Sequence, residues 1–213
     1  MDMISDNNYL RLCGCMGAKP VFSHCARGQD FYTFPLDVQR LSGNIDRINI
    51  ILRQSQLKEL EISDSERLCV EGQLRSFNNR RGEGAKLIIT VFAKELSFTD
   101  EDFCNQVFLK GTLCKVPNLR CTPMGRDICD LMLAVNRPYG RSDYLPCICW
   151  GSTARLASGF SVGTALSLEG RIQSRKYIKL SDEGAVEKTA FEVSVTELRD
   201  FSHSKKEDFV SLL

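Results

Sequence analysis

Hydrophobic and polar residues alternate with a period of two along many stretches of the chain, and Gly- or Pro-containing turns separate these stretches. Side chains alternate between the two faces of a β-strand, so this period predicts strands with one buried face. The predicted strands are 31–40, 47–52, 67–76 and 86–94, followed by 128–137, 144–149, 165–175 and 188–198. A further strand with an interior glycine, Gly14 or Gly111, precedes each set of four. Short helices are predicted at 54–60 and 152–157.

The two sets of strands are copies of one unit. Five blocks match in the same order: 8–14 with 105–111, 28–40 with 125–137, Asp46 with Asp143, 70–76 with 168–174, and 94–98 with 196–201. The first three blocks are 97 residues apart, and the fourth is shifted by one more residue. A fixed order of matching blocks is the signature of an internal repeat.

Five strands with one helix between the third and fourth is the order of the OB-fold, a small Greek-key barrel. Interior glycines suit this fold, because the strands of a small barrel must bend sharply to close it. We therefore predict an all-β chain of two tandem five-stranded OB-fold barrels. The predicted boundaries are 7–98 and 104–201, followed by a short C-terminal tail at 202–213.

Composition fits this organisation but does not name a ligand. The chain has 213 residues, of which 43% are hydrophobic, enough to bury a core. The formal net charge is only +1, from 28 Lys and Arg against 27 Asp and Glu. This balance neither indicates nor excludes a nucleic-acid partner, because a local stripe of cations matters more than the sum.

Few residues suggest catalysis or metal binding. The ten cysteines include no C-x-x-C pair, so we interpret them as reduced thiols that act as small hydrophobes. There are two histidines, no Gly-rich phosphate loop and no G-x-S-x-G motif, which argues against an enzyme. No metal, cofactor or catalytic residue is predicted. The N-terminal sequence does not read as a signal peptide, and no apolar run reaches membrane-spanning length, so we expect a cytoplasmic protein.

The second unit resembles a known family. The segments that carry the resemblance are 105–111, 119–125, 133–137, 143–151, 154–157, 169–177 and 191–198. In this order they are similar to bacterial single-stranded DNA-binding proteins, and the whole chain looks like the tandem two-domain form of clostridial-type bacteria. The resemblance implies that the chain binds single-stranded DNA largely without sequence preference, in replication, recombination or repair.

The resemblance also implies site residues. The stacking positions match Tyr144, Trp150 and Tyr177, with Tyr139 as a looser fourth, and the neighbouring cations match Arg171, Arg175 and Lys176. Bases stack on rings and phosphates pair with cations in sites of this kind. Two alternatives stay open: the rings could belong to the barrel core, and the cations could be a merely solvated face.

The first unit lacks rings at the equivalent positions. Arg47 and Arg53 stand where the second unit has Tyr144 and Trp150, and Asn79 corresponds to Tyr177. With Arg75, these arginines are candidates for phosphate pairing, but this aromatic-poor unit offers no predicted ring platform. We therefore hypothesise that the second unit does most of the stacking, while the first adds backbone contacts or serves dimerisation.

The resemblance further implies partners. Four barrels usually assemble in this family, so two barrels per chain suggest a homodimer. The usual acidic tip that recruits replication proteins has no clear counterpart in the segment 202–213, which holds only the acidic pair Glu207 and Asp208. An alternative is a protein-interaction module or primosome-like adaptor with weak nucleic-acid binding, because OB barrels serve many ligands.

Overall fold

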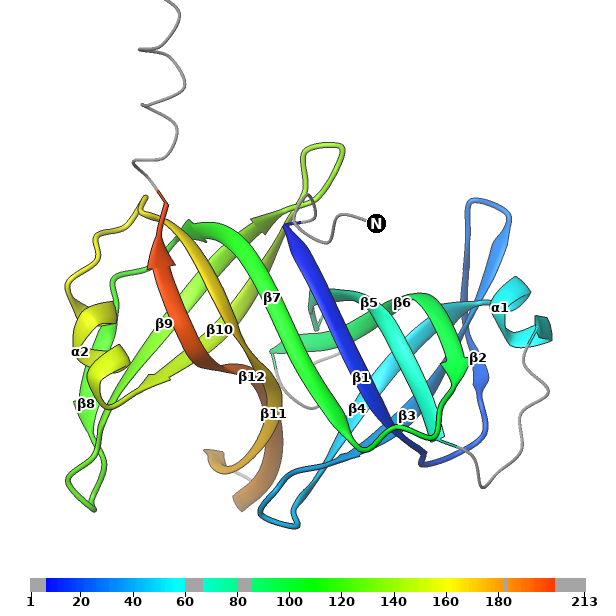
Figure 1. The fold of residues 1–213 in the computed structure, drawn as a ribbon, viewed down its shortest axis with the longest axis horizontal. Helices are drawn as coiled ribbons and strands as arrows, with labels where there is room; N and C mark the ends of the chain where they lie inside the picture. Colours follow the sequence, from blue (N-terminus) through cyan, green and yellow to red (C-terminus); the bar gives the residue numbers. More distant parts are fainter. Residues whose placement is uncertain (1–6, 60–66, 80–85, 182–183, 202–213) are drawn as a thin grey trace, which may run out of the picture. The chain divides into compact units, whose positions relative to one another are not determined.

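The computed structural model of the chain describes residues 7–59, 67–79, 86–181 and 184–201, so the predicted tail at 202–213 lies outside the described residues. The described chain is mostly β-strand, with two short helices (Figure 1). Its elements in order are β1 (Asn8–Met16), β2 (Val21–Ala26), β3 (Gln29–Gln39), β4 (Ile45–Arg53), α1 (Gln54–Glu59), β5 (Arg67–Asn78), β6 (Leu87–Phe98), β7 (Cys104–Leu113), β8 (Asn118–Cys121), β9 (Asp127–Asn136), β10 (Ser142–Trp150), α2 (Ser152–Ser158), β11 (Ala165–Ser181) and β12 (Gly184–Asp200). Neither helix is long and apolar enough to cross a membrane.

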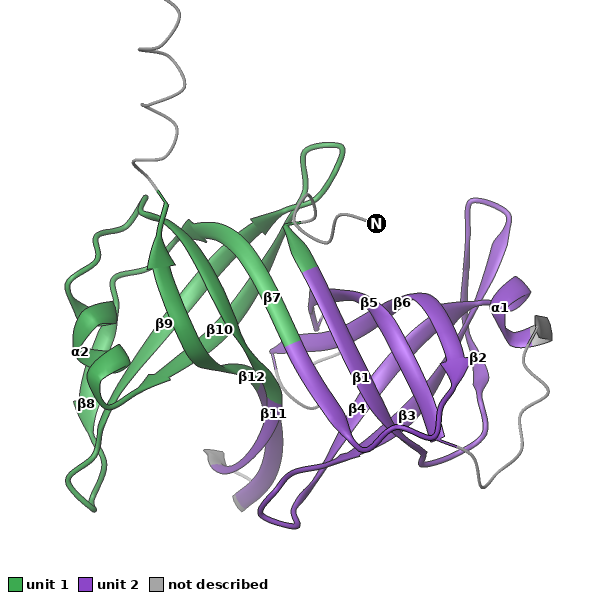
Figure 2. Cartoon of the chain, viewed as in Figure 1, with its two compact units in different colours: residues 1–8, 107–172, 192–213 green, residues 9–106, 173–191 purple. Residues whose placement is uncertain are grey.

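The chain divides into two compact units, coloured separately in Figure 2. The N-unit consists of residues 9–106 and 173–191, and the C-unit consists of residues 107–172 with the two chain ends, 1–8 and 192–213. The end of β11 (173–181) and the beginning of β12 (184–191), which we call the distal parts of these strands, thus belong to the N-unit. Compactness does not test which segments fold independently, so the continuous domains 7–98 and 104–201 stay a prediction.

Each set of strands closes into a barrel. In the first set the order is β2-β3-β4-β6-β5-β1, and β1 pairs additionally with β3, which closes a ring of five strands. In the second set the order is β7-β11-β12-β10-β9-β8, and β7 pairs additionally with β9. The pairs β4–β6 and β10–β12 are parallel, and α1 and α2 each precede the fourth barrel strand. The predicted fold class is confirmed.

Alternating burial explains why these segments are strands. Along β4 the side chains of Ile48, Ile50 and Leu52 are buried, while those of Arg47 and Asn49, on the other face of the strand, are exposed. The same alternation occurs in the C-unit. On β9 the core side chains are Leu131, Leu133 and Val135, and on β10 they are Leu145, Cys147 and Cys149. Removing these apolar side chains from water is the main stabilisation of each barrel.

Four interior glycines, in two matched pairs, mark places where barrel strands approach too closely for a side chain. A Cβ atom at Gly72 would collide with the backbone carbonyl of Phe92, and one at Gly170 would collide with that of Ser194. Gly14 and Gly111 form a second matched pair of this kind. The glycines therefore recur because both copies of the unit need the same close approach, as the barrel interpretation predicts.

β2 and β8 lie in segments that the sequence predicts as loops. Each forms a hairpin, β2 with β3 and β8 with β9, and all their side chains are exposed. A strand that buries neither face shows no period of two, so backbone pairing alone defines it. β11 and β12 also extend to 17 residues each, beyond the predicted 165–175 and 188–198.

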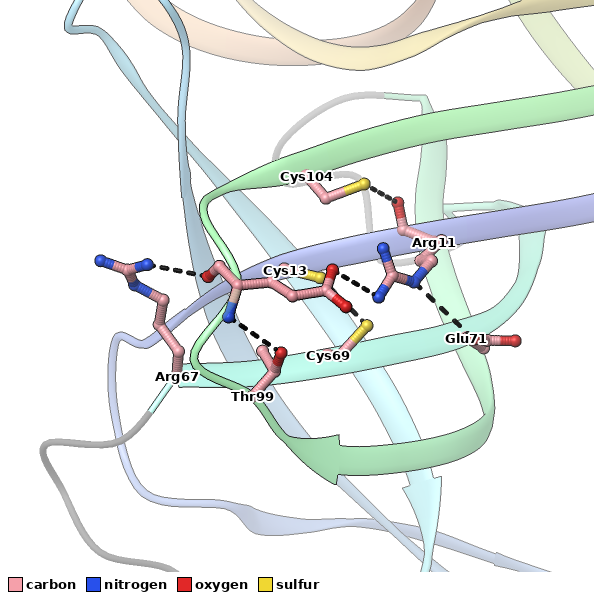
Figure 3. A network of polar contacts seen from close by, with 8 residues as sticks. Arg11, Cys13, Arg67, Cys69, Glu71, Thr99 and Cys104 are labelled. Atoms are coloured by element: carbon pink, nitrogen blue, oxygen red, sulfur yellow. Dashed lines mark hydrogen bonds and ion pairs between the residues drawn. The ribbon is translucent and has the colours of Figure 1, made fainter.

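A polar network fastens the segment after β6 to the N-unit barrel (Figure 3). Arg11 on β1 donates to the Glu101 carboxylate at 2.7 Å and lies 3.8 Å from the Glu71 carboxylate. Arg67 on β5 donates to the backbone carbonyl of Glu101 at 2.8 Å, and the Glu101 N–H donates to Thr99 Oγ1 at 3.1 Å. The segment 99–103, which lies between the predicted domains 7–98 and 104–201, is thus held to the barrel by hydrogen bonds.

The cysteines have several environments. Cys13 and Cys69 face each other on β1 and β5 with sulfurs 3.0 Å apart, and burial raises the pKa of Cys13 to about 12. Burial also raises the pKa of Cys149 to about 12. Five cysteines are buried, as expected for small hydrophobes, whereas Cys15, Cys25 and Cys121 are exposed. All ten are free thiols.

Candidate nucleic-acid interface

Trp150, the single tryptophan, ends β10 on the outer face of the C-unit barrel. Cys147 and Cys149 point into the core, so the alternate residues Tyr144 and Trp150 lie on the opposite face of the strand. The indole is partly exposed, and its Nε1–H donates to the hydroxyl of Ser194 on β12 at 3.2 Å. This hydrogen bond holds the ring in place while leaving part of its surface accessible.

A cation lies against this ring. The guanidinium carbon of Arg126 is 5.2 Å from the centroid of the Trp150 ring, within the range of a cation–π interaction. Arg126 belongs to the β8–β9 turn, where its N–H donates to Thr122 Oγ1 at 3.0 Å and Gly125 adopts a φ of 77°. The sequence did not single out Arg126. Its position directly after the turn glycine is the signal that would have placed it at the start of β9.

The two C-unit tyrosines are open to solvent. Tyr144 is 50% exposed and lies opposite Ala134 of β9, whereas Tyr139 is 97% exposed in the β9–β10 loop with a φ of 70°. Tyr144 and Trp150 share one face of β10 and are six residues apart, which is about 20 Å along a strand. A chain of bases could contact both rings only if it runs along this strand.

Arg171 is exposed on β11. The residue before it, Gly170, lies against the backbone carbonyl of Ser194, the residue that holds the Trp150 indole. The C-unit thus combines four of the predicted site residues: Tyr139, Tyr144, Trp150 and Arg171.

The other predicted residues of the second repeat lie in the N-unit. Arg175 and Lys176 are exposed and Tyr177 is partly exposed on the distal part of β11. Lys176 forms an ion pair with Glu187 on β12 at 2.9 Å. Ser174, the residue before Arg175, donates from its N–H and its hydroxyl to the Asp46 carboxylate, each at 2.7 Å. These hydrogen bonds hold the distal part of β11 in the N-unit.

The predicted arginines of the first repeat differ from one another. Arg47 donates two hydrogen bonds of 2.8 Å to the Asp37 carboxylate, so its charge is already paired. The guanidinium carbon of Arg53 is 5.1 Å from the centroid of the Phe92 ring. The guanidinium carbon of Arg75 is 6.0 Å from the same centroid, and Arg75 also donates to Gln73 Oε1.

Phe31, Arg53, Phe92 and Arg75 form one group on the outer face of the N-unit, which we call the ring–arginine row. They come from four neighbouring strands: β3, β4, β6 and β5. Phe31 lies opposite Arg53 in the β3–β4 register, and the Phe31 and Phe92 ring centroids are 6.1 Å apart. His24 on β2 stacks on Phe31 with centroids 4.9 Å apart, which extends the row by one ring.

The sequence reasoning missed these rings because it looked only at positions equivalent to Tyr144, Trp150 and Tyr177. Phe31 and Phe92 lie on the strands beside those positions. An outward-facing aromatic in an alternating strand is the signal that would have found them.

Among the described residues, no cluster of three or more His, Cys, Asp or Glu side chains could hold a metal ion. The arrangement as a whole offers partly exposed rings beside guanidinium groups on both units. Such surfaces can stack planar bases and attract phosphates.

Residues 104–200 match the single-strand binding protein family. "Single-stranded DNA-binding protein B" of Bacillus subtilis (strain 168) is 38% identical over 80 residues, which cover 34% of this chain and 71% of that protein. "Single-stranded DNA-binding protein 2" of Listeria innocua serovar 6a is also 38% identical over 80 residues, covering 34% of this chain and 50% of that protein. The chain spans about half the length of the first curated relatives it matches.

The whole chain also has a structural neighbour. The crystal structure of the wild-type single-stranded DNA binding protein from Thermus aquaticus superposes with a TM-score of 0.74 at 24% identity, covering 92% of this chain and 93% of that one. At 24% identity this likeness shows the fold alone. It covers both repeats, whereas the family match covers only the second. Together with the relative matched over 71% of its length, the family match assigns the chain. The chain belongs to the single-strand binding protein family.

Proposed function

We propose that this chain binds single-stranded DNA with little sequence preference and protects it during replication, recombination or repair. The observation that carries the proposal is the Trp150 site, where a partly exposed indole is held by Ser194 and flanked by Arg126. The names of the relatives support the same ligand.

In this proposal Trp150 and Tyr144 stack on bases, and Tyr139 adds a further contact from its exposed loop. Arg126 and Arg171 pair with the phosphates between the stacked bases. A stacked base contributes roughly 1–3 kcal/mol, so two or three rings on the C-unit support tight binding. Because every base has a face to stack on, sequence preference is weak, and duplex DNA binds worse because its bases are already stacked.

The test is a titration that follows Trp150 emission. The full chain is mixed with poly-dT at low and high salt, with a duplex control and an independent anisotropy measurement of a labelled strand. We expect quenching by the single strand alone, and binding that weakens with salt because contacted phosphates release counterions. Absence of binding in the anisotropy measurement would overturn the proposal and favour a protein-interaction module. Binding without quenching would keep the ligand but remove Trp150 from the site.

We also propose that the active species is a homodimer, since two barrels per chain make four in a pair. Light scattering on the purified chain tests this directly. The expected mass is twice the 24.0 kDa of one chain.

A further inference from the structure

The two repeats carry rings and cations on the same outer face but on different strands. Gly72 lies against the Phe92 carbonyl as Gly170 lies against the Ser194 carbonyl, so Phe92 and Ser194 are equivalent positions. Arg53 and Trp150 are equivalent as well, at the spacing of 97 residues. In the C-unit the ring is therefore on β10 and its polar partner is on β12. In the N-unit the cation is on β4 and the ring is on β6.

We propose that the ring–arginine row of the N-unit is a second site for single-stranded DNA, in which bases stack on Phe31 and Phe92 and phosphates pair with Arg53 and Arg75. This inference rests on the proposed function of the chain, because it assigns the same ligand to a second surface. It replaces the hypothesis that the first repeat contributes only backbone contacts or dimerisation.

The accessibility of the rings supports a ligand rather than a core role. Phe31 and Phe92 are partly exposed, while the neighbouring residues Phe34 and Val91, which alternate with them, are buried in the core. The row thus lies outside the barrel, where a stabilising role alone does not require aromatic side chains. On β2, beside the row, His24 and Phe22 are also exposed, and Phe22 contacts the Tyr32 ring edge-on at 6.0 Å.

Charge complementarity selects the ligand. Among the described residues, Arg53 has no carboxylate partner, and its guanidinium lies on the Phe92 ring. Arg47, further along the same strand, is instead paired with Asp37 by two hydrogen bonds. Because the Arg53 guanidinium rests on a ring rather than on a carboxylate, it leaves positive charge beside a stacking surface. An unpaired strand, with flat bases and a phosphate at every step, matches both features.

The test moves the single tryptophan into the row. The full chain with F92W and W150F carries one tryptophan at the proposed site, and the full chain with F98W and W150F carries one on the same strand, six residues away. Phe98 is 38% exposed, so both positions accept a larger ring at the surface. Each protein is titrated with poly-dT while anisotropy of a labelled strand reports binding independently.

We expect poly-dT to quench the F92W protein strongly and the F98W protein weakly. Equal quenching of the two, or binding in anisotropy without quenching of F92W, would overturn the second site while leaving the proposed function intact. Absence of binding by the unmodified chain would instead reject the proposed function itself.

A loss-of-function variant provides the second measurement. F31A with F92A should weaken binding of a long strand about tenfold or more, since the loss of one stacked base alone corresponds to a factor of about 5 to 150 and the variant removes two rings. The matched variant F31L with F92L keeps apolar bulk but removes the rings, so it should weaken binding similarly while keeping the thermal midpoint near that of the unmodified chain. Unchanged affinity in the leucine variant would contradict the proposal even if the alanine variant unfolds.

Discussion

Asp46 is a buried carboxylate that connects three segments of the N-unit. It accepts hydrogen bonds from Arg40 at 2.5 and 2.6 Å and from the N–H and hydroxyl of Ser174 at 2.7 Å. Burial alone would raise its pKa, but the hydrogen bonds from Arg40 and Ser174 outweigh burial and hold the pKa below its usual value. Asp143 and Arg137 form the equivalent buried pair in the C-unit, so the ion pair is a property of the repeat.

Replacing Asp46 tests how much this carboxylate stabilises the fold. D46N should lower stability by about 3 kcal/mol, because it leaves the Arg40 charge without its buried partner. Urea unfolding midpoints at neutral pH measure the change. D37N is the matched control, since Asp37 pairs with Arg47 at the surface and its loss should change stability by about 1 kcal/mol or less. Equal effects of the two substitutions would show that Asp46 has no special role.

The lowered pKa predicts a pH dependence with a definite sign. Ionised Asp46 stabilises the fold above its unfolded-state pKa of about 3.9, and this contribution is lost as the pH falls through the lower folded-state pKa. The difference in urea midpoint between the unmodified chain and D46N should therefore be full at pH 7 and shrink below about pH 4. A difference that stays constant down to about pH 2 would contradict this assignment.

Arg126 offers a residue-scale test of the C-unit site. In the proposed function it pairs a phosphate next to Trp150, so R126Q should lower affinity for single strands and reduce the salt slope by about one contacted phosphate. R155Q is the control, because Arg155 lies on α2 and faces Asp127 at 3.3 Å. We expect R155Q to leave the salt slope unchanged. Identical slopes for all three proteins would remove Arg126 from the binding site.

At the scale of elements, barrel closure depends on the close approach at Gly170. G170A should destabilise the protein by about 2 kcal/mol or more, because the added methyl group collides with a backbone carbonyl that cannot rotate away. G159A is a suitable control, since Gly159 has a φ of −82° and its nearest neighbour would be 3.5 Å from the new Cβ. Thermal unfolding of both variants measures the difference. A stable G170A protein would mean that the strands can separate locally at little cost.

Much of this element structure could be predicted from the sequence, because it depends on local periodicity. β4 and β10 alternate buried and exposed side chains, and the interior glycines recur in both repeats. β2 and β8 could not be predicted, since strands with every side chain exposed carry no periodic signal. Residues 173–181 of β11 read in the sequence as a continuation of the second repeat, and contacts such as the hydrogen bonds between Ser174 and Asp46 show that they pack in the N-unit.

The candidate site was predictable to a similar degree and for a similar reason. Tyr139, Tyr144, Trp150 and Arg171 share the C-unit, whereas Arg175, Lys176 and Tyr177 lie in the N-unit. Spacing along the chain cannot show that β11 passes from one unit into the other. Nor can an alignment of the repeats find Phe92, because its equivalent in the second repeat is a serine, and the ring has changed strands while staying on the same face.

At the scale of the whole molecule, a net charge of +1 shows that binding has to depend on local surfaces. If the two units carry separate sites, strand length decides how many of them one strand engages. A short strand can occupy either unit, so loss of one site leaves the other available. A long strand that reaches both sites binds more tightly, because the second contact is intramolecular once the first has formed.

This argument predicts how paired variants respond to strand length. Y144A with W150A removes the C-unit rings, and F31A with F92A removes the N-unit rings. Each pair should reduce affinity for a short oligo-dT by only about twofold, since half of the sites remain, but reduce affinity for a long one by about tenfold or more. Anisotropy titrations with labelled strands of both lengths measure the effect. If the C-unit pair abolished binding at every length while the N-unit pair had no effect at any length, the chain would carry one working site, and the N-unit would serve assembly instead.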